Sequence, residues 1–306
     1  MPMQKVIFGL GVAWLLVVSG NISFLYGQAA APIGTVEEST QLGRDLFLTI
    51  GVDIFPHQWQ TGNISVAGVG GNIQSFTDFG VGAIPSLTLT YKRFFLSGSY
   101  LVTPEFDFGT GTDFAPVASG LPVGLDQPFA VLRETSVKAS RQEGDVTVGY
   151  FPLDWLGLAI GWKGVFQDYE NQTRFSLVNG QVLPPPFNPP GGWNKTESRT
   201  NYNGPIGGVL VSARINDSFS LLGNVFGGYL FTSCTPGCSS IFDNAAYASS
   251  KIVLRYALPT LPQLSWTFGY RVQVINTFID DSNIKFDTGN GIDLTHGPIL
   301  GMNYRF

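Results

Sequence analysis

The chain contains two histidines, the side chain used most often for general acid–base catalysis. His57 follows Asp53 closely and gives the best acid–base pairing in the sequence, whereas His296 lies near the other end. Neither belongs to an Asp-x-His or His-x-Ser motif of the kind that could build a hydrolytic site. We therefore expect no enzyme, with a loop role for His57 and a rim role for His296.

The other residues able to do chemistry are charged, and they fall on the polar faces of alternating segments. If these faces line an interior, the lining holds more cations than anions, although the chain carries a formal net charge of −5. A basic lining predicts a passage that favours anions. The alternative is that the charges pair into a plug that fixes the strand register. The predicted lining charges are Lys92, Arg141, Lys163, Arg214, Lys251, Arg255, Arg271 and Arg305, against Asp45, Asp53, Glu143 and Asp145.

The elements that must position these charges are strands. Residues 264–275 alternate strictly, with Trp266, Phe268 and Tyr270 on one face and Thr267 and Arg271 on the other. Alternation of this kind, over about ten residues, suits a tilted membrane-spanning strand. We expect further strands at 45–54, 81–92, 94–105, 156–167, 204–215, 218–230, 245–258 and 297–306.

The composition indicates that much of the protein's surface faces lipid. Charged residues make up 13% of the chain, about half the usual share for soluble domains, and aromatic residues make up another 13%. No apolar run beyond the N-terminal segment is long enough for a spanning helix. A chain too apolar for water and without such helices is best satisfied by a closed β-barrel, because lipid tolerates no open sheet edge. A soluble two-sheet sandwich would carry more charge on its polar faces.

The number of strands depends on residues 134–151, which could form one long strand or a hairpin. Short connections are expected at 92–93, 152–155, 216–217 and 259–262, and long ones at 56–80, 106–131, 168–203, 231–244 and 278–292. Short and long connections alternate only if 134–151 is one strand. This predicts ten strands, with twelve as the alternative if a long loop hides a hairpin.

Both ends of the chain carry signals for export. Lys5 precedes an apolar run and a segment of small residues up to Ala29, which is the pattern of a signal peptide at 1–29. A periplasmic segment at 30–43 and a barrel at 44–306 would follow. The final strand ends in Tyr304-Arg305-Phe306, with both aromatic residues on its apolar face.

This terminal strand resembles those of bacterial outer-membrane β-barrels, whose assembly machinery reads a final aromatic residue. The resemblance extends over the whole mature chain. It implies an all-β antiparallel up-and-down barrel with short periplasmic turns and long extracellular loops. It also implies contact with outer-membrane lipid and lipopolysaccharide. Tyr304 and Phe306 would then be the assembly signal. The acidic net charge argues against a nucleic-acid partner.

The predicted outer loops hold the remaining candidates. Cys234 and Cys238 flank a Pro-Gly turn, and in an oxidising compartment we expect a disulfide between them. Asp280, Asp281, Asp287 and Asp293 gather near the last loop, but their spacing matches no calcium motif, and we expect neither a metal nor a cofactor.

The sequence is consistent with two functions. The first is a small or constricted channel for small solutes with a basic lumen. The second is a surface-interaction or structural barrel with a plugged lumen that displays long extracellular loops. The sequence does not set the oligomeric state.

Overall fold

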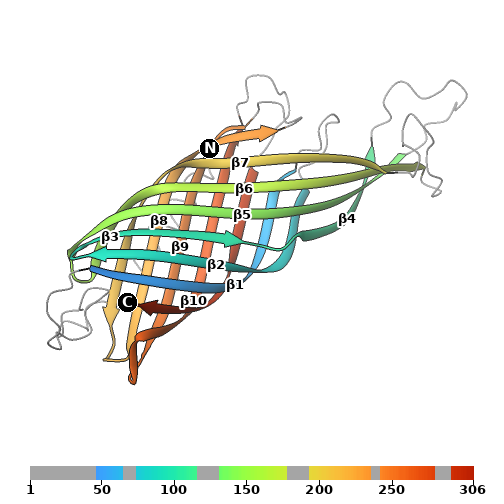
Figure 1. Cartoon of the computed structure of the whole chain (residues 1–306). Helices are drawn as coiled ribbons and strands as arrows, with labels where there is room; N and C mark the ends of the chain where they lie inside the picture. Colours follow the sequence, from blue (N-terminus) through green and yellow to red (C-terminus); the bar gives the residue numbers. More distant parts are fainter. Residues whose placement is uncertain (1–45, 65–73, 116–130, 178–192, 236–241, 280–290) are drawn as a thin grey trace, which may run out of the picture.

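The chain forms a closed antiparallel β-barrel in the computed structural model, which describes residues 46–64, 74–115, 131–177, 193–235, 242–279 and 291–306 (Figure 1). The strands are β1 (Leu46–Ile64), β2 (Gln74–Tyr91), β3 (Phe94–Val102), β4 (Phe106–Ala115), β5 (Val131–Leu153), β6 (Leu156–Leu177), β7 (Asn194–Arg214), β8 (Phe219–Thr235), β9 (Phe242–Leu258), β10 (Leu261–Ile279) and β11 (Gly291–Arg305).

Apart from β3 and β4, which both pair with β5, every strand pairs with its neighbours in sequence, and β1 pairs with β11. The ring closes where β3 pairs with β5, so that β4 adds no position to it. The prediction of ten strands is therefore confirmed, and residues 134–151 lie within the single strand β5. No helix among the described residues is long and apolar enough to cross a membrane.

The strand β4 continues β3 along the same edge of β5. Val102 at the end of β3 pairs with Gln142, and Phe106 at the start of β4 pairs with Ala139. Pro104 between them has no N–H to give to a ladder. The hydroxyl of Thr103 takes its place, since it donates to the carbonyl of Arg141 at 2.7 Å. The sequence prediction of a loop over 106–131 is corrected here, because part of this range is strand.

The strands are longer than the apolar alternation indicated. The strands β5, β6 and β7 have 23, 22 and 21 residues, whereas about 9–11 residues cross a bilayer. The surplus lies at the ends opposite the short turns, where outward positions become polar and the alternation disappears. Four strands continue farthest as a projecting sheet, called here the tongue (Figure 1). We define the tongue as β4 from Gly109, β5 up to Ser140, β6 from Asp168 and β7 up to Asn201.

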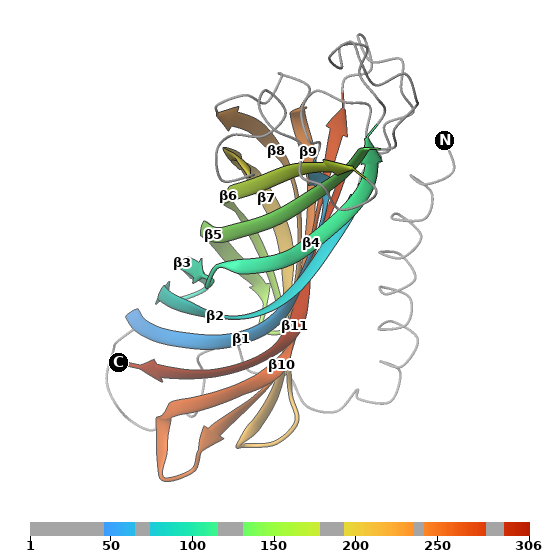
Figure 2. The same ribbon diagram turned by 90° about the vertical axis from the view of Figure 1, so that its right-hand side faces the viewer.

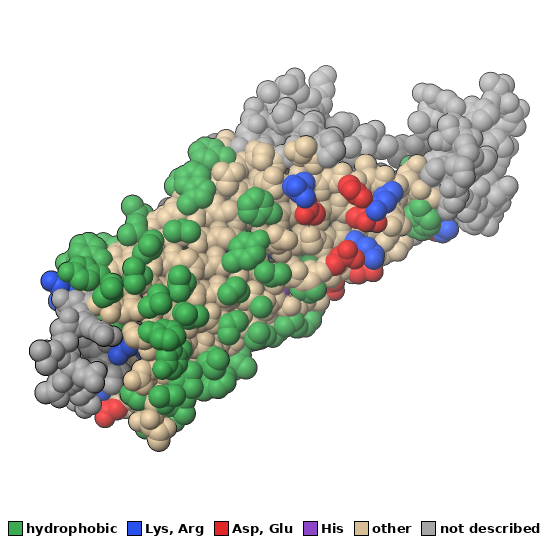
Figure 3. Space-filling model, in the orientation of Figure 1, with side chains coloured by type: hydrophobic (Ala, Val, Ile, Leu, Met, Phe, Trp, Pro, Cys, Tyr) green, Lys and Arg blue, Asp and Glu red, His purple; other side chains and the backbone are tan. Residues whose placement is uncertain are grey.

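The two faces of the wall differ in chemistry. Outward side chains are apolar over most of the barrel, with Ile160 at 68% and Phe268 at 64% exposure. Figure 3 shows hydrophobic side chains over the body of the barrel and charged ones toward its two ends, with the larger group near the tongue. Figure 2, turned by 90°, shows the strands as one curved wall. The inward side chains form four apolar clusters and one polar layer.

Candidate functional site: an ion-pair layer across the lumen

The centre of the interior is the carboxylate of Glu143 on β5, which is 1% exposed. Arg141 donates to it through Nε at 2.7 Å and Lys163 through Nζ at 2.8 Å. Arg271 donates through Nη2 at 3.0 Å. The amide of Gln273 adds a fourth hydrogen bond at 2.8 Å. One buried carboxylate thus contacts three cations, so that each of them has an anionic partner, as buried charge requires.

The second carboxylate is that of Asp293 on β11, also 1% exposed. It forms an ion pair with Arg141. Gln167 donates to its Oδ2 at 2.8 Å and the indole of Trp59 at 2.9 Å. Arg141 therefore bridges Glu143 and Asp293. The side chains of Arg141, Glu143 and Asp293 are all at most 1% exposed.

These contacts join opposite sides of the barrel. In the ring, β5 and β10 are five positions apart in either direction, and so are β6 and β11. Glu143–Arg271 is a β5–β10 contact, and Gln167–Asp293 is a β6–β11 contact. Side chains thus meet across the full width of the interior, at one level.

The edge of this layer is formed by Asp53 and Asp145. Lys251 donates to Asp53 at 2.5 Å, and Thr267 donates to the same carboxylate at 3.4 Å. Asp145 lies 3.6 Å from Lys163 and accepts from Ser99 at 2.8 Å. We call the complete set the ion-pair layer. It comprises Asp53, Arg141, Glu143, Asp145, Lys163, Lys251, Arg271 and Asp293.

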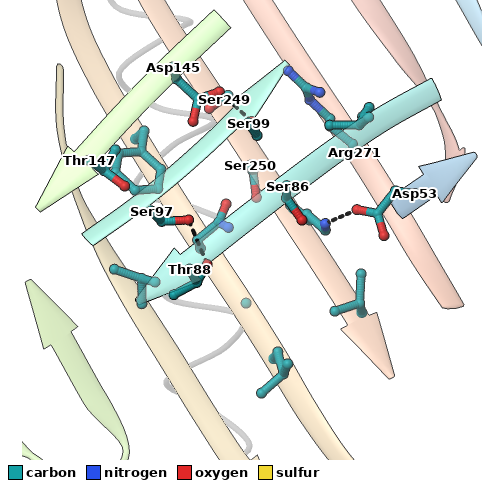
Figure 4. A pocket seen from close by; sticks show the side chains of 18 of the residues that line it. Asp53, Ser86, Thr88, Ser97, Ser99, Asp145, Thr147, Ser249, Ser250 and Arg271 are labelled. Atoms are coloured by element: carbon teal, nitrogen blue, oxygen red, sulfur yellow. Dashed lines mark hydrogen bonds and ion pairs between the residues drawn. The ribbon is translucent and has the colours of Figure 1, made fainter. Parts of the chain in front are cut away.

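On the side of the short turns, the layer borders a cavity of about 350 Å³. One wall presents hydroxyl groups from β2 and β3, including Thr88 and Ser97, which lie 2.8 Å apart (Figure 4). Phe95, Phe151 and Phe226 also line it. Asp53, Asp145 and Arg271 form its boundary with the layer, so the cavity stops at the ion pairs.

On the other side, aromatic rings fill the interior. Trp59, Phe106, Val137, Ala139 and Tyr169 form one buried cluster. The rings of Trp59 and Phe106 meet edge to face with centroids 5.0 Å apart. The guanidinium of Arg141 lies 5.3 Å from the Trp59 ring, which links this cluster to the ion-pair layer. Polar and apolar packing therefore occupy the interior in consecutive layers.

The predicted lining charges divide into three groups. Arg141, Lys163, Lys251, Arg271, Asp53, Glu143 and Asp145 all lie in the ion-pair layer. Arg255 and Arg305 occupy inward positions near the ends of β9 and β11. Lys92 and Arg214 lie outside the interior. Lys92 is in the exposed turn after β2, with φ of 53°, and Arg214, at the end of β7, pairs with Asp217 in the turn that follows. Asp45 lies outside the described residues.

One layer member was missed from sequence. The sequence places Asp293 with the acidic residues near the last loop, but it lies in β11 and faces inward. With it, the layer holds four cations (Arg141, Lys163, Lys251, Arg271) and four anions (Asp53, Glu143, Asp145, Asp293). The expected excess of positive charge is therefore absent at this level. The alternation Asp293, Thr295, Gly297 was the available signal, since these residues continue the polar face of the last strand.

The histidines lie apart. His57 is fully buried in β1, stacked on Phe55 at 4.5 Å, with Nδ1 2.8 Å from the carbonyl of Phe55. It is therefore not in a loop. His296 lies on the outer wall, 2.7 Å from the hydroxyl of Tyr270. Cys238 and the side chain of Cys234 lie outside the described residues, and so do residues 1–43. The described residues include no group of three or more His, Cys, Asp or Glu placed to hold a metal.

No family model matches the chain, and no curated protein does. Solved structures do. The outer-membrane protease OmpT of Escherichia coli is 12% identical, with a TM-score of 0.47, over 85% of this chain and 96% of that one. A FadL homologue of Pseudomonas aeruginosa is 9% identical (TM-score 0.32; 85% and 90%). Ail of Yersinia pestis is 11% identical (TM-score 0.24; 85% and 99%).

The closed ring and its apolar outer wall decide the class. The chain is a bacterial outer-membrane β-barrel in its architecture. The three solved barrels differ in activity, and their sequences are too distant from this chain to assign it any of these activities.

Proposed function

We propose that this barrel is closed to solutes and is a surface-interaction protein of the outer membrane, which binds its partners outside the cell through the tongue. The observation that carries the proposal is the contact of Glu143 with Arg271 on the opposite strand, within a layer whose central side chains are at most 1% exposed. A solute would have to separate these side chains to pass.

The free energy needed to separate these ion pairs supports a closed lumen. Removing one partner from a buried ion pair leaves an uncompensated charge and costs about 3–5 kcal/mol. Glu143 alone holds three cations, so that a passage beside it disrupts several pairs together. Each 1.4 kcal/mol reduces the open population tenfold, which makes thermal opening rare. The aromatic cluster around Trp59 and Phe106 adds a second obstruction on the extracellular side.

The charged outer face of the tongue supports a role outside the membrane. The outward face of the tongue carries ion pairs between neighbouring strands, including Asp168–Arg199 at 2.5 Å and Glu170–Lys195 at 2.9 Å. Lys138 lies 3.2 Å from Glu105. Charged side chains of this kind belong in water, whereas Trp162 and Phe166, lower on β6, are outward and apolar. The tongue therefore projects beyond the lipid.

The constricted channel is the second candidate. The cavity of about 350 Å³ supports it, because its hydroxyl wall would suit a polar solute entering from the side of the short turns. We favour closure because the cavity ends at the ion-pair layer. Catalysis is not favoured, since Asp53 pairs with Lys251 and His57 bonds to the backbone.

Several expectations from sequence remain part of this proposal. We propose that residues 1–29 are removed on export and that the barrel resides in the outer membrane, in contact with lipopolysaccharide. Tyr304 and Phe306 would serve its assembly. A disulfide between Cys234 and Cys238 would close the loop after β8.

Solute flux into proteoliposomes tests the proposal. Vesicles containing the folded barrel are diluted into an isotonic solution of a small neutral sugar, and their swelling is followed by light scattering. A general porin in matched vesicles is the positive control, and heat-dependent gel mobility verifies folding. We expect no swelling above that of empty vesicles. Swelling that slows as the sugar grows larger would refute closure.

A further inference from the structure

The wall of the barrel has a gap in its backbone pairing beside the tongue. Pairing of β2 with β3 ends at Ala83–Val102, although β2 continues to Gln74 and remains paired with β1 on its other side. The strand β4 pairs with β5 up to Ala115–Val131. Among the described residues, the β4 edge that faces away from β5 has no strand partner. Figure 1 shows β4 continuing with β5–β7 while the upper ends of β1 and β2 turn away.

The start of this edge is protected by side chains. The carboxylate of Asp78 on β2 accepts a hydrogen bond from the backbone N–H of Asp107 at 2.9 Å, which replaces a ladder bond. Gly109 then forms a bulge with φ of 76°, and its N–H donates to Asp107 at 3.0 Å. Below this point Phe106 packs against Gly80, where a Cβ would lie 2.6 Å from its ring.

Beyond Gly109, the protection ends. The segment Thr110–Ala115 contains one charged residue, Asp113, and no Lys or Pro, which are the residues that guard an edge strand most effectively. The opposite edge of the tongue is different, since β7 begins with Asn194-Lys195 and continues with Glu197. An unguarded row of backbone N–H and C=O groups is a template for one more strand.

We propose that the β4 edge of the tongue binds an extended peptide segment rich in basic residues, which adds to the sheet as a further strand. This deepens the proposed surface-interaction function and names its partner class. Backbone pairing selects an extended segment whatever its sequence. The preference for basic residues follows from the carboxylates of Asp78, Glu105 and Asp107, which lie at the start of the edge, where Lys138 pairs with Glu105. A second copy of the chain would instead add further carboxylates to the same edge.

The probe is a ten-residue synthetic peptide that alternates lysine and valine, added to the full-length barrel in lipid nanodiscs. Two control peptides separate the contributions. One is N-methylated at alternate residues, which removes its N–H groups along one edge without changing its charge. The other carries glutamate in place of lysine. Fluorescence anisotropy measures the Kd, and hydrogen exchange of the β4 amides locates the binding.

We expect at least tenfold weaker binding for both control peptides, and slower exchange of β4 when the lysine peptide is bound. Equal affinity for the N-methylated peptide would overturn the proposal. Slow exchange of the β4 edge before any peptide is added would also overturn it, because the edge would then already be paired. Concentration-dependent dimers in light scattering would identify a second copy as the occupant and contradict the proposal.

Two neighbouring substitutions provide a matched pair. Adjacent strand residues direct their N–H groups to opposite edges, so of Gly111→Pro and Thr112→Pro one disturbs pairing with β5 and the other removes a free-edge donor. We expect the variant that retains wild-type thermal stability to lose peptide binding tenfold. Wild-type affinity in that variant would refute the proposed site. Neither substitution touches the ion-pair layer, so solute flux reports on lumen closure separately.

Discussion

Glu143 of β5 and Arg271 of β10 stand on opposite sides of the ring, and the guanidinium donates to the carboxylate at 3.0 Å. Both strands are rigid parts of the closed sheet, and the contact therefore ties the two walls together. Because Glu143 also accepts from Arg141 and Lys163, its single carboxylate connects three strands in the centre of the barrel.

Neutralising this carboxylate should destabilise the barrel. Glu143→Gln leaves three cations close together without their shared anion, and we expect a loss of about 3–5 kcal/mol in the free energy of unfolding. Urea titration in lipid vesicles measures it. Asp145→Asn is the control, because its side chain is 27% exposed and lies 3.6 Å from Lys163, and it should cost no more than about 1 kcal/mol. Equal losses for the two variants would contradict the central role of Glu143.

The packing of Phe106 on Gly80 should appear as coupling between the two positions. Phe106→Ala empties a fully buried site and should cost about 3–5 kcal/mol. Gly80→Ala places a Cβ 2.6 Å from the same ring and should cost about 1–3 kcal/mol. In the double variant the new methyl group occupies space that the ring has left, so the combined loss should be smaller than the sum. A double-mutant cycle measures the difference, and strict additivity would show that the two sites do not share this contact.

Charge placed on the outer wall should map the lipid boundary. Phe268 is 64% exposed on β10, and Phe268→Arg should cost about 2–4 kcal/mol if this position faces acyl chains. Gln60→Arg tests the same charge on β1 above the apolar zone, where we expect a change within about 0.5 kcal/mol. Unfolding in vesicles measures both variants. Similar values for the two would place them in the same environment and contradict the boundary.

Acid should loosen the outer face of the tongue. Hydrogen bonds from Gln172 and Lys195 lower the pKa of Glu170, which lies outside the spanning part of β6. Because the folded-state pKa is lower than the unfolded one, the stabilisation is present above the unfolded value and is lost as pH falls through the folded one. Amide exchange of β6 and β7 near this pair, corrected for intrinsic rates, should therefore be faster at acidic than at neutral pH. Glu170→Gln should remove the pH dependence, and persistence of the full effect would assign it to other groups.

Much of the fold could be predicted because lipid imposes a strict pattern. The outward residues of β10, such as Trp266, Phe268 and Tyr270, must be apolar where they meet acyl chains, and the opposite face of Thr267 and Arg271 must be polar or small. The parity of short and long connections then determined that β5 is one strand.

The upper ends of the strands could not be predicted in the same way. Above the lipid, the outward positions Asp168, Glu170 and Gln172 face water, and alternation of polarity stops while the backbone ladder continues. The strand β4 was not predicted because Phe106 and Phe108 are followed by Gly109-Thr110-Gly111-Thr112, in which no apolar side chain continues their alternation.

The site was predicted in part. The alternation of residues along each strand predicts which charges face the interior, but it does not predict which of them pair. Arg141 and Asp293 are far apart in sequence and meet only because the ring closes. Lys92 shows where the alternation of strand residues stops being a guide. It lies one residue after the end of β2, in the turn, and therefore faces solvent and not the lumen.

Single-channel recording in planar bilayers tests lumen closure most directly. The folded wild-type barrel should insert and remain silent, whereas a variant combining Glu143→Ala, Arg271→Ala and Trp59→Ala, which clears the contact between β5 and β10 and the largest ring of the aromatic cluster, should show discrete conductance steps. Heat-dependent gel mobility controls for folding of both proteins. Steady conductance by the wild-type barrel, with the same step size as the variant, would contradict a lumen closed by the ion-pair layer.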